Sequence, residues 1–233
     1  MSDRRLIVRL PAVILGVGCA LLLSSDRPSA SNTGFRFAKT LVLAGTGTIG
    51  DNWISLPFSH AYPTAAAFCT KVGLVLDNPG GGIPGATVTV VDPTTGVETT
   101  GICGTPSAAS VSIPPGWGIR VRQSNVAGAK AQIFISGAHD PTLHINVPPR
   151  RSSGTYPGYW YSLPYNSTAQ TYEDLCIEIG MTTKEGALIH VNAATGANEI
   201  FACTTTQAKD KLPTGDAIEI LAPNPRTFLP AVD

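Results

Sequence analysis

Apolar and polar residues alternate along several short segments of the chain, which is the pattern typical of half-buried strands. The segment "ATVTVVDPTTGVETTGIC" (86–103) alternates on both sides of a turn at 92–96 and predicts a hairpin. The segment "LIHVNAATGANEIFAC" (188–203) repeats this pattern, with Asn192 in the place of Asp92, and both residues suit turn chemistry. Further strands are predicted in "DNWISLPF" (51–58), "IPPGWGIRV" (113–121), "AQIFIS" (131–136) and "TLHINV" (142–147).

A short helix is predicted twice, each time bounded by a threonine and a glycine. Thr64 and Thr171 can cap the two N-termini, and Asp174 follows Thr171 by three residues, as in a capping box. Gly73 and Gly180 suit the left-handed residue that ends a helix. Apolar residues fall on one face at helical spacing: Phe68, Cys69 and Val72 in the first helix, and Leu175, Cys176 and Ile179 in the second.

These elements belong to a long internal repeat. The segment "NWISLPFSHAYPTAAAFCTKVG" (52–73) aligns without a gap with "YWYSLPYNSTAQTYEDLCIEIG" (159–180), and the match resumes across the two hairpins. We interpret this as a tandem duplication of a module of normal domain size, with a first module at 31–140 and a homologous second at 141–233. Each module is predicted to be mostly β, a small sandwich or open barrel with one short α-helix.

The first thirty residues are expected to lie outside the fold. Residues 1–30 have an arginine-containing start, the apolar stretch "LPAVILGVGCALLL" and a small, polar end, which predicts a secretory signal peptide. A retained membrane anchor is the alternative, and the shortness of the apolar stretch disfavours it. Arg4-Arg5 fits a twin-arginine signal only in part, and the apolar run continuing beyond Cys19 argues against a lipidated cysteine.

Once the signal is removed, four cysteines remain, and an even number in an exported chain favours disulfides. Sequence spacing alone leaves three pairings open. The repeat gives each module one pair, which makes Cys69–Cys103 and Cys176–Cys203 the economical assignment. Zinc is the competing reading, and it is disfavoured because the cysteines have no C-x-x-C spacing and no nearby histidine pair.

Charge and composition mainly exclude classes of function. The formal net charge is zero and charged residues make up 14% of the chain, so a basic nucleic-acid surface is not expected. The stretch "GTGTIG" (45–50) follows an apolar run and fits G-x-G-x-x-G. Pro57 and poor helix formers follow it, and no acid stands about twenty residues later, so we predict a turn, with no nucleotide and no other cofactor.

A search for catalytic residues finds no H-E-x-x-H, G-x-S-x-G or Walker motif. His139-Asp140 is interpreted as a surface turn, and Asp92 as a turn residue. Asp51, Asp77 and Glu98 carry no pattern that would make them a glycosidase pair. The loop "LDNPGGG" (76–82) lacks the carboxylate ladder of a calcium site, so no metal and no enzyme activity are expected, although scattered catalytic residues stay an open alternative.

The aromatic residues are the remaining candidates for binding. Trp53 and Trp160 are retained in both modules and are predicted to fill each module's core, with a sugar-stacking platform as the alternative. Trp117 and the stretch "YPGYWY", which contains Tyr156, Tyr159 and Tyr161, are the candidate exposed ligand contacts.

The succession of W-x-S-L-P, a threonine-led helix, a V-x-x-x-D/N-x-x-T-G hairpin and P-G-x-G-I resembles a β-rich module of exported bacterial proteins. In such proteins the module often occurs in tandem and beside other extracellular β domains. The resemblance covers both modules and implies secretion and a β fold, and it carries over no catalytic residue.

We therefore expect an exported, non-enzymatic structural or adhesive protein of the cell surface or an extracellular assembly, with the periplasm also open. Its expected partners are other copies of itself or other extracellular components, and tandem modules would allow multivalent contact. The alternative is a carbohydrate-binding protein that uses exposed aromatic residues.

Overall fold

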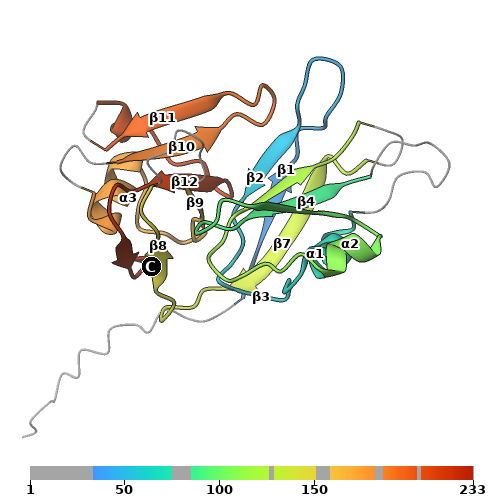
Figure 1. The fold of residues 1–233 in the computed structure, drawn as a ribbon, viewed down its shortest axis with the longest axis horizontal. Helices are drawn as coiled ribbons and strands as arrows, with labels where there is room; N and C mark the ends of the chain where they lie inside the picture. The colour runs from blue at the N-terminus through green and yellow to red at the C-terminus, as the bar shows by residue number, and fades with distance from the viewer. Residues whose placement is uncertain are drawn as a thin grey trace, which may run out of the picture.

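The computed structural model describes residues 34–74, 85–125, 129–150, 158–181, 186–203 and 206–232. The expected signal peptide, the loop at 76–82 and Tyr156 lie outside these residues. The described chain is mostly β, in several antiparallel sheets, as the alternating pattern predicted (Figure 1). Figure 1 shows two halves side by side, with the longer helices on their outer sides.

The first half holds seven strands and two short helices. In chain order these are β1 (Phe35–Thr40), β2 (Asp51–Ile54), β3 (Ser59–His60), α1 (Ala65–Val72), β4 (Thr87–Val91), β5 (Glu98–Ile102), α2 (Pro106–Ala109), β6 (Ile119–Arg122) and β7 (Gln132–Ala138).

The second half follows a similar order of elements. It contains β8 (Ile145–Val147), β9 (Tyr159–Ser162), α3 (Tyr172–Ile179), β10 (Ala187–Val191), β11 (Asn198–Ala202), the 3₁₀ helix η1 (Thr206–Lys209), β12 (Ala217–Leu221) and β13 (Arg226–Phe228).

The main sheets of the two halves have the same strand order. One sheet runs β2-β6-β4-β5 and the other β9-β12-β10-β11. In equivalent registers, Trp53 lies opposite Arg120 and Trp160 lies opposite Glu219. This matches the arrangement that a repeat requires, while descent of the two halves from one module stays a prediction.

The remaining strands join the outer parts of each half. β7 pairs with β1 and β3, and β8 pairs with β13, all antiparallel. The pairing of β7 with β1 and β3 thus lies within the first half, and the pairing of β8 with β13 lies within the second half.

Both predicted helices are present, with the predicted caps. The Thr64 hydroxyl accepts a hydrogen bond from the Ala67 N–H at 3.3 Å. Thr171 and Asp174 form the full capping box, and Gly73 and Gly180 end the helices with φ of 76° and 79°. Their conformation favours glycine because a Cβ is strained at positive φ.

The predicted disulfides are also confirmed. Cys69 on α1 is bonded to Cys103 beyond β5, and Cys176 on α3 is bonded to Cys203 beyond β11. Each bond ties the helix of one half to the end of the edge strand of the same half. Two disulfides indicate an oxidising, extracellular-type environment.

Each half has its own apolar core between helix and sheet. Phe68, Val88 and Ile119 are fully buried in the first, and Leu175, Leu188 and Ile218 in the second. Phe58 crosses from the first half into the second core, so the two halves also share apolar contacts. Among the described residues, no helix has the length and hydropathy needed to cross a bilayer.

Removing either disulfide is expected to destabilise the protein substantially. The bonded cysteines are 34 and 27 residues apart, so chain entropy predicts a loss of about 3–4 kcal/mol of unfolding free energy for each double alanine variant. Equilibrium denaturation of Cys69→Ala/Cys103→Ala and Cys176→Ala/Cys203→Ala would measure both losses. A loss below about 1 kcal/mol in both variants would contradict this account.

Candidate functional site

The ends of β2 and β9 exchange hydrogen bonds through two serines. The Ser162 hydroxyl accepts from the Leu56 N–H at 2.9 Å, and the Ser55 hydroxyl accepts from the Leu163 N–H at 2.8 Å. Each hydroxyl also donates to a carbonyl of the opposite half, Ser55 to Asp216 and Ser162 to Trp117, both at 2.7 Å. The W-x-S-L-P motif therefore joins the two halves reciprocally.

Two glycine turns complete this exchange. The Ser55 N–H donates to the Gly215 carbonyl and the Ser162 N–H donates to the Gly116 carbonyl, both at 3.0 Å. Gly116 and Gly215 have φ of 81° and 83°. Such values favour glycine, which explains why both halves place a glycine here.

The two retained tryptophans stack on each other at the same junction. The ring centroids of Trp53 and Trp160 lie 3.4 Å apart with an interplanar angle of 4°. They are 6% and 7% exposed and belong to a small separate cluster with Val91 and Ala217. We expected each indole in the core of its own half; the structure places both between the halves.

The glycine-rich stretch at 45–50 is a tight turn that reaches the other half. The Ile49 and Gly50 N–H groups donate to the Ala194 and Ala193 carbonyls at 2.9 and 3.0 Å. Strand β2 follows the stretch, where a nucleotide-binding fold would need a helix.

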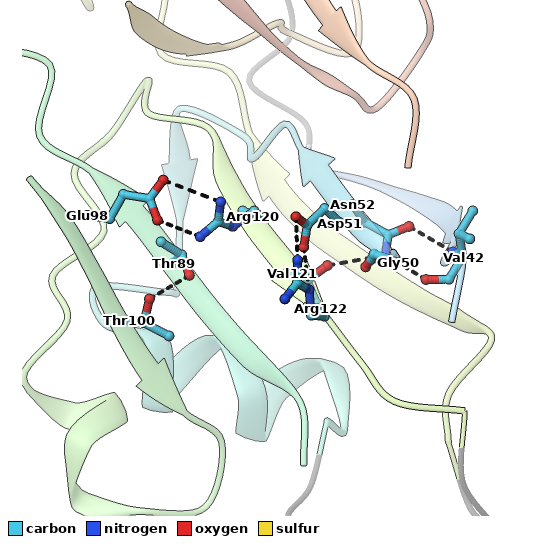
Figure 2. Close-up of polar contacts among 10 residues, drawn as sticks. All are labelled: Val42, Gly50, Asp51, Asn52, Thr89, Glu98, Thr100, Arg120, Val121 and Arg122. Carbon is cyan, nitrogen blue, oxygen red and sulfur yellow. Dashed lines mark hydrogen bonds and ion pairs between the residues drawn. The ribbon is translucent and has the colours of Figure 1, made fainter. Parts of the chain in front are cut away.

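Figure 2 shows how Asn52 holds this turn. Its amide exchanges hydrogen bonds with the Val42 backbone at 2.8 and 2.9 Å and donates to the Gly50 carbonyl at 2.9 Å. Asn52 is 2% exposed and also donates to the Val121 carbonyl, so a buried amide links the turn to strand β6.

A cleft of about 340 Å³ lies where the two main sheets meet, and we call it the Trp cleft. Its lining repeats across the junction in equivalent pairs: Trp53 and Trp160, Val91 and Val191, Gly96 and Gly196. Ile49 of the glycine-rich turn lines it as well. The cleft therefore exists only when both halves are assembled.

Ion pairs line the first-half side of the Trp cleft (Figure 2). Arg120 binds both Glu98 oxygens at 2.6 and 3.3 Å, and Arg122 binds both Asp51 oxygens at 2.6 and 2.7 Å. The Arg120 guanidinium also lies 5.4 Å from the Trp53 ring centroid, within cation–π range.

A second charged cluster crosses the junction beside the serines. Lys39 of the first half forms an ion pair with Asp216 of the second. His190 lies between Asp216 and Glu199, at 3.1 Å from each. Burial opposes protonation of His190, but the hydrogen bonds to both carboxylates outweigh it and raise its pKa above the usual 6.5.

Two of the tyrosines that were predicted to be exposed ligand contacts are buried. Tyr159 and Tyr161 are 3% and 0% exposed, so their assignment as exposed ligand contacts was wrong. Tyr159 instead donates to the Gly116 carbonyl at 3.0 Å, and burial raises the pKa of both phenols. Trp117 is half-buried, packs against both cores and lines a separate cleft of about 450 Å³, the Trp117 cleft.

The other sequence candidates have structural partners. Asp92 accepts from the Thr94 and Thr95 N–H groups at 2.7 and 3.0 Å, the predicted turn chemistry. His139 is 8% exposed and lies against Phe58, so its expected place on a surface turn was wrong, whereas its neighbour Asp140 does cap a turn. Within the described ranges, no group of three potential ligands could hold a metal ion, and Asp77 lies outside them.

Sequence reasoning missed the Trp cleft and the Lys39–Asp216 contact. The repeat did carry a signal, because W-x-S-L-P is retained in both halves although its serine has no evident role within either half alone. Comparisons with models of known protein families, with curated protein sequences and with solved structures found no significant match to this chain.

Removing the exchanging hydroxyls should weaken the junction. Ser55→Ala and Ser162→Ala each leave a buried N–H without its acceptor, which costs about 1–3 kcal/mol of unfolding free energy. Denaturant unfolding followed by tryptophan fluorescence would measure the loss, with the exposed Ser112→Ala as the matched control. Equal stability of all three variants would rule out the serines as the junction's main polar contact.

The raised pKa of His190 predicts a specific pH dependence. Its stabilising contribution is fully present below the unfolded value of 6.5 and disappears as pH rises through the higher folded pKa. The partly buried His60 and the buried His139, whose pKa values desolvation lowers, act in the opposite direction. The difference in unfolding free energy between the wild type and His190→Gln should therefore shrink above pH 6.5, and His144→Gln is the exposed control. A difference that grows with pH would contradict this assignment.

Proposed function

We propose that this chain is an exported, non-enzymatic structural or adhesive protein of the cell surface or an extracellular assembly. The two disulfides, the expected signal peptide and the resemblance to modules of exported bacterial proteins support export. The low charge and the β-rich fold suit a role in contact with other surfaces.

One observation carries this proposal: the reciprocal junction makes two disulfide-closed halves into one body. The serine exchange, the indole stack and the Lys39–Asp216 pair all cross it. Such a body is suited to keep the outer surfaces of its two halves at a fixed distance from each other in an assembly.

The main sheets also offer edges to other copies. In the described residues, β5 and β11 each pair with one strand and form the outer edges of their sheets. Unpaired edge strands are templates for pairing with another chain. On β11, Ile200 is 52% exposed, which places a large apolar side chain on a sheet edge. Other copies of this chain are the proposed partners at this edge.

Carbohydrate binding is the second candidate function. The observation in its favour is the Trp117 cleft, which places Asn146, His144 and Arg226 beside the half-buried indole. An aromatic face with a few planar polar groups is a usual form of small-ligand site. The buried Tyr159 and Tyr161 are not part of this candidate surface.

Self-association should depend on the β11 edge. Light scattering and electron microscopy of the oxidised chain from residue 31 should reveal assemblies that grow with concentration. Ile200→Lys places a charge on the edge and removes apolar contact worth about 1.5–3 kcal/mol, so association should weaken by roughly tenfold or more. Ile177→Lys is the matched control, because Ile177 is 58% exposed but lies on α3.

A monomer at all concentrations would contradict self-association through this edge. Saturable binding to a glycan array that is lost in Trp117→Ala would then favour the second candidate. Equal association of Ile200→Lys and Ile177→Lys would exclude β11 as the contact.

A further inference from the structure

The Trp cleft carries opposite charges at equivalent positions of its two halves. Arg120 lies opposite Trp53 in the first sheet, and Glu219 lies opposite Trp160 in the second. Both side chains line the cleft. The residues that lie opposite the two tryptophans are thus equivalent in position and opposite in charge.

The first-half side shows a cation held between an indole and a carboxylate. The Arg120 guanidinium lies over Trp53 and is bonded to Glu98. The second-half side offers an indole, Trp160, and a carboxylate, Glu219, with Asn198 in the position that Glu98 holds. Among the second-half residues described as lining the cleft, none is a cation.

Glu219 is a buried carboxyl with unused hydrogen-bonding capacity. It is 4% exposed, and within the described chain its one hydrogen bond comes from the Gly158 N–H at 2.6 Å. A carboxylate can accept about four hydrogen bonds, and leaving a buried charge unpaired is costly. Burial raises the pKa of Glu219, and the Gly158 bond only partly opposes this.

The charges that line the cleft are unbalanced by one. Asp51, Glu98 and Glu219 are acidic, and Arg120 and Arg122 are basic. Both guanidiniums are bonded to the first two acids, so among the described residues that line the cleft Glu219 is the carboxyl without a counter-ion.

We propose that the Trp cleft binds a small organic cation, a protonated primary amine on a short apolar skeleton. Its ammonium group pairs with Glu219, and its carbon chain lies against Trp160 and Val191. The cleft of about 340 Å³ is at the small end of ligand pockets, which suits a compact ligand.

Binding would be tested with n-butylammonium, butane-1,4-diammonium and neutral 1-butanol, using tryptophan fluorescence and calorimetry at pH 7.5. The amines should bind saturably, with a dissociation constant on the order of 1 mM, and at least about tenfold tighter than butanol. A lysine-containing tripeptide with blocked ends distinguishes a free amine from a polypeptide side chain.

Two variants separate Glu219 from buried carboxyls in general. Glu219→Gln keeps the shape and removes the charge, so amine affinity should fall about tenfold or more. Glu178→Gln is the matched control. Glu178 lies on α3 outside the cleft, burial raises its pKa to about 7, and it accepts one hydrogen bond from the Ala231 N–H at 3.2 Å. This control should bind amines like the wild type.

A further measurement needs no variant. Amine binding to the wild type should weaken as pH falls through the raised pKa of Glu219, because the protonated carboxyl no longer attracts a cation. Equal binding of butanol, undiminished binding in Glu219→Gln, or an affinity independent of pH would each overturn the proposal. Saturable binding of a neutral sugar in this cleft without amine binding would overturn it too.

Discussion

Two buried serine hydroxyls satisfy backbone groups that neither half of the chain can satisfy alone. Ser55 and Ser162 each accept an N–H and donate to a carbonyl of the opposite half. Because unpaired buried N–H groups are costly, docking that buries the ends of β2 and β9 is favourable only with this exchange in place. The indole stack, the Trp cleft and the bonds from the turn at 45–50 to the second half all depend on this docking.

The contacts that stabilise each half are different from the contacts that form the Trp cleft. Each helix, its disulfide and the core face of its sheet lie within one half. The opposite faces of the two sheets meet at Trp53 and Trp160 and form the Trp cleft. A change in a core therefore acts mainly on one half, whereas a change at the junction acts on both.

The parts predicted correctly from sequence are those that local chemistry determines. Threonine caps, positive-φ glycines and turn residues such as Asp92 and Asn192 fix the helices and hairpins over a few residues. The repeat then assigned the disulfides. The alternating pattern gave the β class, but it did not reveal which surface of each sheet would be covered.

The burial of Tyr159, Tyr161 and His139 could not be predicted in this way. It follows from packing between segments that are distant in sequence, such as Tyr159 with the Gly116 turn and His139 with Phe58. The pairing of Trp53 with Trp160 has the same origin. A retained tryptophan indicates burial in general, and only the docking of the halves shows that each indole covers the other.

Arg120 in the first half and Glu219 in the second half hold equivalent positions and carry opposite charges, so the two sides of the junction are chemically different. Two copies of the first half docked in this manner would each bring an arginine to the cleft, and two copies of the second half would each bring a glutamate. The Lys39–Asp216 pair likewise needs one member from each half. Like charges would thus disfavour pairing of two second halves, and two first halves would lack the acidic partner of Lys39. The covalent link keeps the unlike partner at high effective concentration. The covalent chain therefore brings together the two unlike halves whose charges fit at the junction.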